Sequence, residues 1–69
     1  MGNEEMIAEL NAQLQSKEGR VRKLARFVEE LQLSRENLPT LENYAVEMQS
    51  LAYQIRQLLV AKATAFAAR

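Results

Sequence analysis

A chain of 69 residues is long enough for one small domain, and such a domain buries only about 60% of its unfolded surface. Its nine basic and nine acidic side chains cancel, which argues against binding nucleic acid or anionic lipid by overall charge. The lack of cysteine and histidine excludes disulfides and the usual zinc-ligand sets, so association with another chain is the expected source of extra stability.

The first predicted element is a helix over about residues 4–36, with Asn3 as its N-cap and an acidic first turn. Its apolar residues alternate three and four apart, which is the a/d heptad pattern of a coiled-coil seam. Lys17 is a polar residue in this seam, where it either sets the register or extends its ammonium group outward. The unbroken heptad phase favours a continuous helix through Gly19 over a break at that residue. The seam residues are Ile7, Leu10, Leu14, Lys17, Val21, Leu24, Val28, Leu31 and Leu38.

A turn is predicted at residues 37–40. Asn37 is a residue type that tolerates the left-handed conformation at a helix end, and Leu38 could fold back onto the last turn in a Schellman cap. Pro39 cannot continue a helix interior, while the side chain of Thr40 can cap a following helix. Because the connection is short, we expect the chain to return on itself as an antiparallel helical hairpin.

The second predicted helix covers about residues 41–67 and has a wider apolar side than one neighbouring helix requires. Its residues fit two overlapping a/d phases, and a helix with two adjacent seams can contact two neighbours. The first phase runs through Tyr44, Met48, Leu51, Ile55 and Leu58, and the second through Ala45, Met48, Ala52, Ile55 and Leu59. The predicted fold is therefore all-α: one domain, residues 1–69, forming a two-helix antiparallel hairpin with a coiled-coil-like seam. Oligomerisation or the helices of a partner would complete its core.

The surplus apolar face is the predicted partner-binding site. Tyr53 falls off both seams, and tyrosine is enriched at protein interfaces. The candidate partner-binding residues are Phe27, Leu31, Leu51, Tyr53, Leu58, Leu59 and Phe66. A second candidate site is a run of basic side chains on the first helix, which could face phosphates or remain a solvated surface. The candidate phosphate-binding residues are Arg20, Arg22, Lys23 and Arg26.

The sequence offers little from which to assemble an active site. It has no glycine-rich phosphate loop, and its carboxylates fall on predicted solvated helix faces. We therefore expect no enzyme activity, no cofactor and no metal site. The most apolar stretch, residues 58–68, contains Lys62 and is far shorter than the ~20 apolar residues of a membrane span, so we expect a soluble, cytoplasmic protein.

Residues 28–59 resemble the small helical-hairpin co-chaperones that type III secretion systems use to hold the needle subunit. The similar features are polar residues before the turn, a Glu-x-Tyr start and a following apolar stripe, at Glu42, Asn43, Tyr44, Leu51, Ile55 and Leu58. The turn sequence Asn-Leu-Pro-Thr departs from the more Gly- and Asp-rich loop of that family. In that family the hairpin pairs with a larger helical-repeat chaperone, and together they keep the needle protein from polymerising.

These features predict a non-enzymatic protein–protein interaction module, an adaptor or co-chaperone that buries its surplus apolar face against a partner protein or another copy. The resemblance implies a role in type III secretion. The alternative is a dimeric, four-helix-bundle regulator that binds nucleic acid through the basic run from Lys17 to Arg26.

Overall fold

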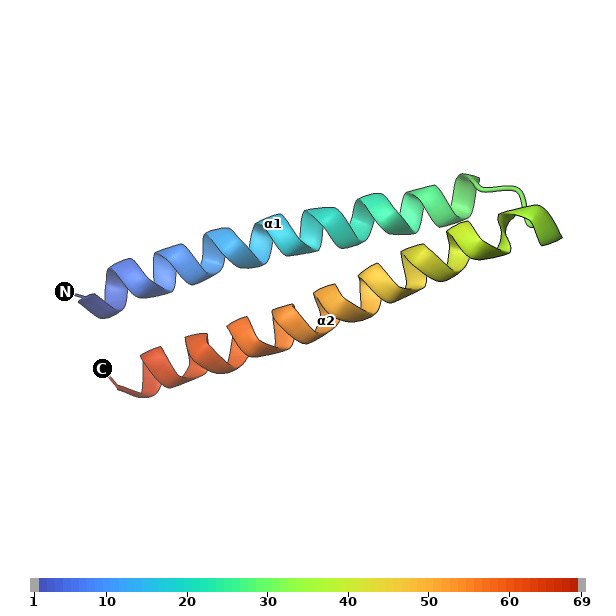
Figure 1. Ribbon diagram of the computed structural model, residues 1–69. Helices are drawn as coiled ribbons and strands as arrows, with labels where there is room; N and C mark the ends of the chain where they lie inside the picture. Colours follow the sequence, from blue (N-terminus) through green and yellow to red (C-terminus); the bar gives the residue numbers. More distant parts are fainter. Residues whose placement is uncertain (1, 69) are drawn as a thin grey trace.

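The computed structural model describes residues 2–68, which form two long helices joined by a short connection. Helix α1 spans Gly2–Glu30, a single 3₁₀ turn η1 spans Arg35–Asn37, and helix α2 spans Leu38–Ala67. The helices run antiparallel side by side, so that both ends of the chain lie at the same end of the molecule (Figure 1). The Cα trace measures 53 × 15 × 11 Å, which is the shape of a rod two helices across. The predicted all-α antiparallel hairpin is confirmed.

Helix α1 is continuous through its middle. Gly19 lies within the helix, and a Cβ atom added there would meet nothing within 4 Å. The predicted continuity through Gly19 is therefore confirmed. The predicted N-cap is wrong, because α1 already begins at Gly2 and includes Asn3. The Asn3 side chain instead donates a hydrogen bond from Nδ2 to the carbonyl oxygen of Ala65, 3.4 Å away, and so ties the two ends of the hairpin together.

The connection between the helices lies earlier than predicted. Helix α1 ends at Glu30 instead of residue 36, and residues 31–34 form the turn that was expected at 37–40. Asn37 has φ −94° and ψ 0°, so it does not adopt the left-handed conformation of the expected cap. Its Nδ2 atom donates a 2.6 Å hydrogen bond to the carbonyl oxygen of Gln32. This hydrogen bond closes the turn from its C-terminal side.

Pro39 lies at the start of a helix instead of after the end of one. It lies in the first turn of α2, where the fixed φ of proline suits the helix and its missing N–H has no intrahelical acceptor. Helix α2 therefore starts at Leu38, three residues before the predicted boundary, and Thr40 lies inside it instead of capping it. The C-terminal boundary of α2 at Ala67 agrees with the prediction.

The core is a single seam between the two helices. Leu24 is the one large side chain in the described chain that is fully buried, at 0% exposure. Three other apolar residues are buried with it, while most remaining seam residues, such as Met48 and Ile55, are only half-buried. The buried residues are Leu14, Leu24, Leu51 and Ala65.

The hairpin exposes more surface than a compact protein of its mass. Its accessible surface is 5494 Å², about 1,100 Å² more than the roughly 4,400 Å² typical of a folded 7.9 kDa monomer. A rod two helices across has no second layer to cover its outer faces. Neither described helix has an apolar stretch of the length and hydropathy that crossing a bilayer requires.

Candidate partner-binding site

The outer side of α2 carries a row of large apolar side chains. Val46, Tyr53 and Val60 recur every seven residues, which is about two helical turns, so they share one face. Their exposures are 65%, 64% and 56%. Leu51 faces α1, and Tyr53 lies two residues further along, a rotation of about 200°, so this face points away from α1. We call Val46, Tyr53 and Val60 the α2 outer stripe.

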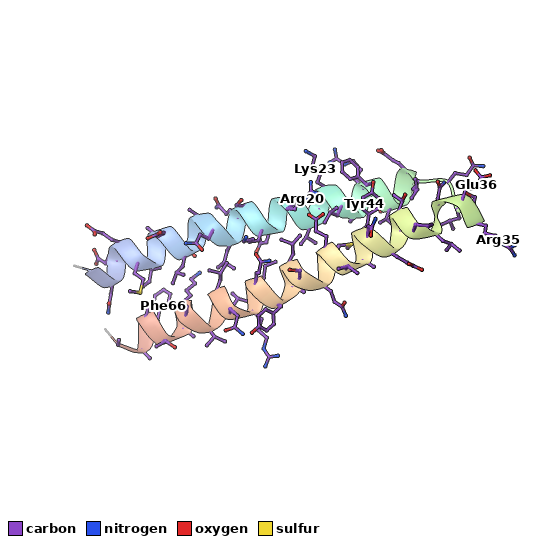
Figure 2. The ribbon with its side chains drawn as sticks, viewed as in Figure 1. Arg20, Lys23, Arg35, Glu36, Tyr44 and Phe66 are labelled. Atoms are coloured by element: carbon purple, nitrogen blue, oxygen red, sulfur yellow. The ribbon has the colours of Figure 1, made fainter. Side chains whose placement is uncertain are left out.

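The predicted partner-binding residues divide between this outer side and the seam. Tyr53 and Leu59 are exposed, and Phe66 is 47% exposed although Figure 2 shows its ring directed towards α1. Phe27, Leu31 and Leu58 are half-buried. Leu51 is 7% exposed and packs against α1, so it is not available to a partner and its assignment to the partner surface is wrong. The physical reason is that the first a/d phase of α2 is the phase that α1 covers.

Phe27 and Tyr44 form an aromatic pair across the seam. Their ring centroids lie 5.9 Å apart with planes inclined by 36°, a geometry typical of attractive aromatic contacts. Figure 2 shows Tyr44 directed from α2 towards α1. Phe27 therefore stabilises the hairpin near its turn and is not a free anchor for another chain.

Several exposed apolar residues were not among the predicted partner-binding residues. Val46 and Val60 belong to the α2 outer stripe, and Leu38, the first residue of α2, is half-exposed. Leu33 is 79% exposed in the turn. The signal for Val46 and Val60 was present as a third heptad phase shared with Tyr53, but two richer phases of the same helix concealed it. No signal marked Leu33, because the turn was expected further along the chain.

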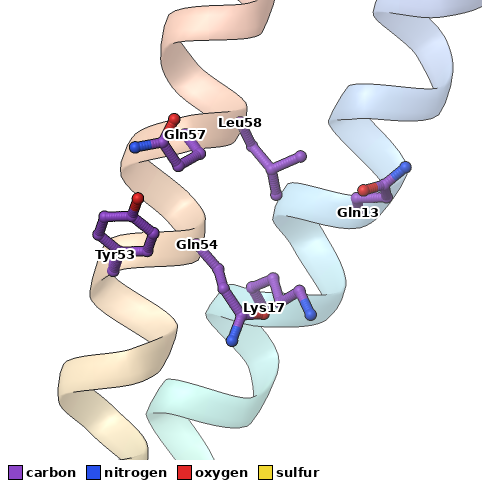
Figure 3. Close-up of a pocket in the computed structure, with 6 residues that line it drawn as sticks. All are labelled: Gln13, Lys17, Tyr53, Gln54, Gln57 and Leu58. Atoms are coloured by element: carbon purple, nitrogen blue, oxygen red, sulfur yellow. The ribbon is translucent and has the colours of Figure 1, made fainter.

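A groove of about 260 Å³ lies between the helices beside Tyr53 (Figure 3). Most of its lining residues carry a polar group, and in the close-up the phenol ring of Tyr53 stands on the side of α2 away from α1. Lys17, the polar residue of the α1 seam, is half-buried at this groove, which agrees with a lysine that extends outward from a seam. The groove offers amide, ammonium and phenol groups for hydrogen bonding. Its lining residues are Gln13, Lys17, Tyr53, Gln54, Gln57 and Leu58.

The basic run of α1 is divided by the fold. Arg22, Lys23 and Arg26 surround Gly19 in a shallow pocket of about 340 Å³ on α1. Arg26 follows the buried Leu24 by two residues, so this pocket faces away from α2. Figure 2 shows Lys23 projecting from that side of α1. We call this the basic pocket.

Arg20 does not belong to the basic pocket. It forms a two-point ion pair with Glu47 of α2, with Nε–Oε2 and Nη2–Oε1 distances of 2.6 and 3.1 Å. The hydrogen bond from Arg20 holds the pKa of the Glu47 carboxyl below its ordinary value, and the same contact raises the pKa of Arg20. Both side chains are over two-fifths exposed, so solvent screens the pair. Its main effect is to fix the alignment of the two helices.

The charges in the basic pocket are only partly neutralised. Arg22 approaches Glu18 at 3.4 Å on the same helix, and both side chains are more than half exposed. Lys23 and Arg26 have no ion-pair partner within residues 2–68. The pocket therefore presents two uncompensated cations and one loosely paired cation to solvent.

Searches of protein-family models, curated proteins and solved structures give no match to this chain. The similarity of residues 28–59 to the type III secretion co-chaperones therefore remains a hypothesis based on the sequence. The hairpin offers two outer faces for binding, the α2 outer stripe and the basic pocket.

The two faces differ in what they can bind. The α2 outer stripe is apolar and regular, so it suits another amphipathic helix. The basic pocket suits an anionic group such as a phosphate or carboxylate. Within residues 2–68, no three acidic side chains, the only candidate ligands in a chain without cysteine or histidine, are grouped so that they could hold a metal ion.

Proposed function

We propose that the protein is a non-enzymatic interaction module that binds a helix of another protein, or of another copy of the chain, with the outer side of α2. The observation that carries the proposal is the α2 outer stripe, in which Val46, Tyr53 and Val60 are each more than half exposed. An apolar row of this regularity over about four helical turns is typical of a helix that packs against a second neighbour.

The surface area of the hairpin supports the same proposal. The excess of about 1,100 Å² over a compact monomer is comparable to the ~800 Å² that each partner buries in a protein–protein interface of ordinary size. A partner helix would bury side chains that are already held in place on a helix of this chain. A partner helix would therefore gain their burial with little further ordering of this chain.

The specific form of the proposal is an adaptor or co-chaperone. The resemblance of residues 28–59 to the needle-subunit co-chaperones supports this form and points to a larger helical chaperone as one class of partner. The exposed aromatic ring of Tyr53 would be the central anchor of the contact.

Site-specific photo-crosslinking in cells that produce the protein tests the proposal. A photoreactive phenylalanine in place of Tyr53 should crosslink to a protein, whereas the same group in place of Gln15, exposed on α1, should not. Val46→Lys with Val60→Lys should abolish the crosslink without loss of helix, since lysine has a higher helix propensity than valine. Equal crosslinking from Tyr53 and Gln15, or crosslinking that survives the two lysines, would refute the proposed surface.

A second candidate function is the binding of a phosphate-bearing polymer by the basic pocket. One observation favours it: Arg22, Lys23 and Arg26 surround Gly19, which has no side chain to fill the pocket. Reversing these three charges to glutamate should abolish binding to structured RNA, and the wild-type affinity should fall steeply with salt. Arg20→Gln serves as the control, because Arg20 is engaged with Glu47 and lies outside the pocket. Unchanged binding after the triple reversal would exclude this function.

A further inference from the structure

The charges on the outer side of α2 are arranged symmetrically about Gln49. Glu42 lies seven residues before Gln49 and Arg56 seven residues after it, so all three occupy one face of the helix. This face is the one that carries the α2 outer stripe, because Gln49 lies four residues before Tyr53, about one helical turn. Glu42 and Arg56 are exposed, and neither has an ion-pair partner within residues 2–68.

We propose that the occupant of this face is a second copy of the chain, whose α2 lies antiparallel to the first with a two-fold axis through Gln49. This inference rests on the proposed function and names its partner. In such a dimer Glu42 of each copy lies opposite Arg56 of the second copy, so two ion pairs form, one on each side of the axis. A self-complementary arrangement of this kind is what a two-fold interface requires.

The charge pattern disfavours the parallel orientation. In a parallel pair every residue lies beside its own counterpart, so Glu42 would meet Glu42 and Arg56 would meet Arg56. Like charges opposed across a helix pair are unfavourable, whereas the antiparallel pair converts the same residues into attractions. The orientation is thus fixed by two side chains of opposite sign at equal distances from one glutamine.

The apolar residues match the same axis. In a two-fold antiparallel pair, the same edge of each helix lies on the same side of the interface. Val46 lies three residues before Gln49 and Tyr53 four residues after it, both on one edge. Val46 of one copy therefore lies within one residue rise, about 1.5 Å, of the level of Tyr53 of the second copy. The contact occurs twice, once on each side of the axis.

The opposite edge of α2 has small residues near the axis and the large Leu59 further along. Ala45 and Ala52 lie four residues before and three residues after Gln49, so Ala45 of one copy meets Ala52 of the second copy by the same symmetry. Small side chains on this edge let the helices approach closely while the larger residues fill the other edge. Leu38 and Val60, each eleven residues from Gln49, meet at the two ends of the interface.

A charge-swap series tests the inference. The wild-type chain should sediment as a dimer of twice its 7.9 kDa mass and dissociate on dilution. Glu42→Arg and Arg56→Glu should each weaken the dimer by about tenfold in Kd, because each single change turns both ion pairs into repulsions. The double variant Glu42→Arg with Arg56→Glu should restore the wild-type Kd to within about twofold, since both pairs return with their signs exchanged. Circular dichroism confirms that each variant keeps its helices.

Cysteines introduced at three positions report the orientation, because the chain has no cysteine of its own. Gln49→Cys lies on the axis and should form a disulfide-linked dimer on mild oxidation, as should the double variant Glu42→Cys with Arg56→Cys. Glu42→Cys alone should not, because it has no counterpart nearby in the antiparallel pair. A disulfide from Glu42→Cys alone would overturn the antiparallel axis, and so would a double charge swap that fails to restore the dimer.

The outcome also separates this inference from the function on which it rests. If the chain remains monomeric at all concentrations but crosslinks from Tyr53 to a different protein, the proposed dimer is wrong and the proposed interaction function stands. A monomeric chain that gives no specific crosslink from Tyr53 overturns both.

Discussion

Replacing Gly19 by alanine should stabilise the hairpin by about 0.8–1.0 kcal/mol, the difference in helix propensity between the two residues. Gly19 lies inside α1 without a positive φ, and a Cβ atom there would meet nothing within 4 Å, so the change introduces no clash or strain. For a domain of this size, such a gain corresponds to a rise of roughly 4–8 °C in Tm. Thermal and urea unfolding, followed by circular dichroism, would measure it.

Ala12 provides a matched control. It lies seven residues before Gly19 on the same exposed side of α1, so Ala12→Gly should cost about the amount that Gly19→Ala gains. The double variant, which exchanges the two residues, should unfold within about 0.3 kcal/mol of wild type, because sites this far apart contribute independently. Helix propensity acts only where the chain is helical. A Gly19→Ala variant with no gain in stability would therefore show that α1 is interrupted at Gly19 in solution, contrary to the structure.

Three further predictions concern the seam and the turn. Leu24→Ala should cost about 2–5 kcal/mol and leave the chain largely unfolded at room temperature, seen as lost helicity, because Leu24 is fully buried in a thin core. The Arg20–Glu47 ion pair should stabilise the hairpin at neutral pH and lose this effect as the pH falls through the lowered pKa of Glu47. The difference in unfolding between wild type and Glu47→Gln should accordingly vanish in acid; a difference that persists there would contradict this assignment. Asn37→Ala should cost about 0.5–1.5 kcal/mol and speed hydrogen exchange in the turn, because it removes the hydrogen bond to the Gln32 carbonyl.

The hairpin could be predicted from sequence because its apolar residues alternate three and four apart over both helices. That pattern fixes which side of each helix is buried, and the buried Leu14, Leu24 and Leu51 all lie on the predicted seams. It does not fix where a helix ends. Leu31 and Leu38 continue the heptad phase past Glu30, so the first helix was predicted six residues too long.

The turn was predicted at the wrong residues because proline is found both after the end of a helix and in the first turn of one. Pro39 cannot lie in a helix interior, but the same fixed φ suits the first turn of a helix. The sequence does not distinguish these cases without knowledge of where the chain reverses. The actual reversal, at residues 31–34, contains neither glycine nor proline and so carried no recognisable turn signal.

The candidate site was predicted in part for a related reason. Periodicity identified α2 as a helix with more than one apolar side, and Tyr53 as a residue outside both seams, but it could not say which side α1 would cover. Arg20 was grouped with its basic neighbours because they are adjacent in sequence. The structure turns Arg20 towards Glu47 and leaves Arg22, Lys23 and Arg26 together on the far side of α1.

The hairpin has its two candidate binding surfaces on opposite outer sides, the α2 outer stripe on one helix and the basic pocket on the other. With two helices of ~10 Å diameter between them, occupants of the two surfaces would be separated by about 20 Å and could not touch. Neither occupant would obstruct the other. If both proposed contacts form, the hairpin would act as a rigid spacer that holds an apolar helix and an anionic ligand at a fixed separation, with free energies of binding that add.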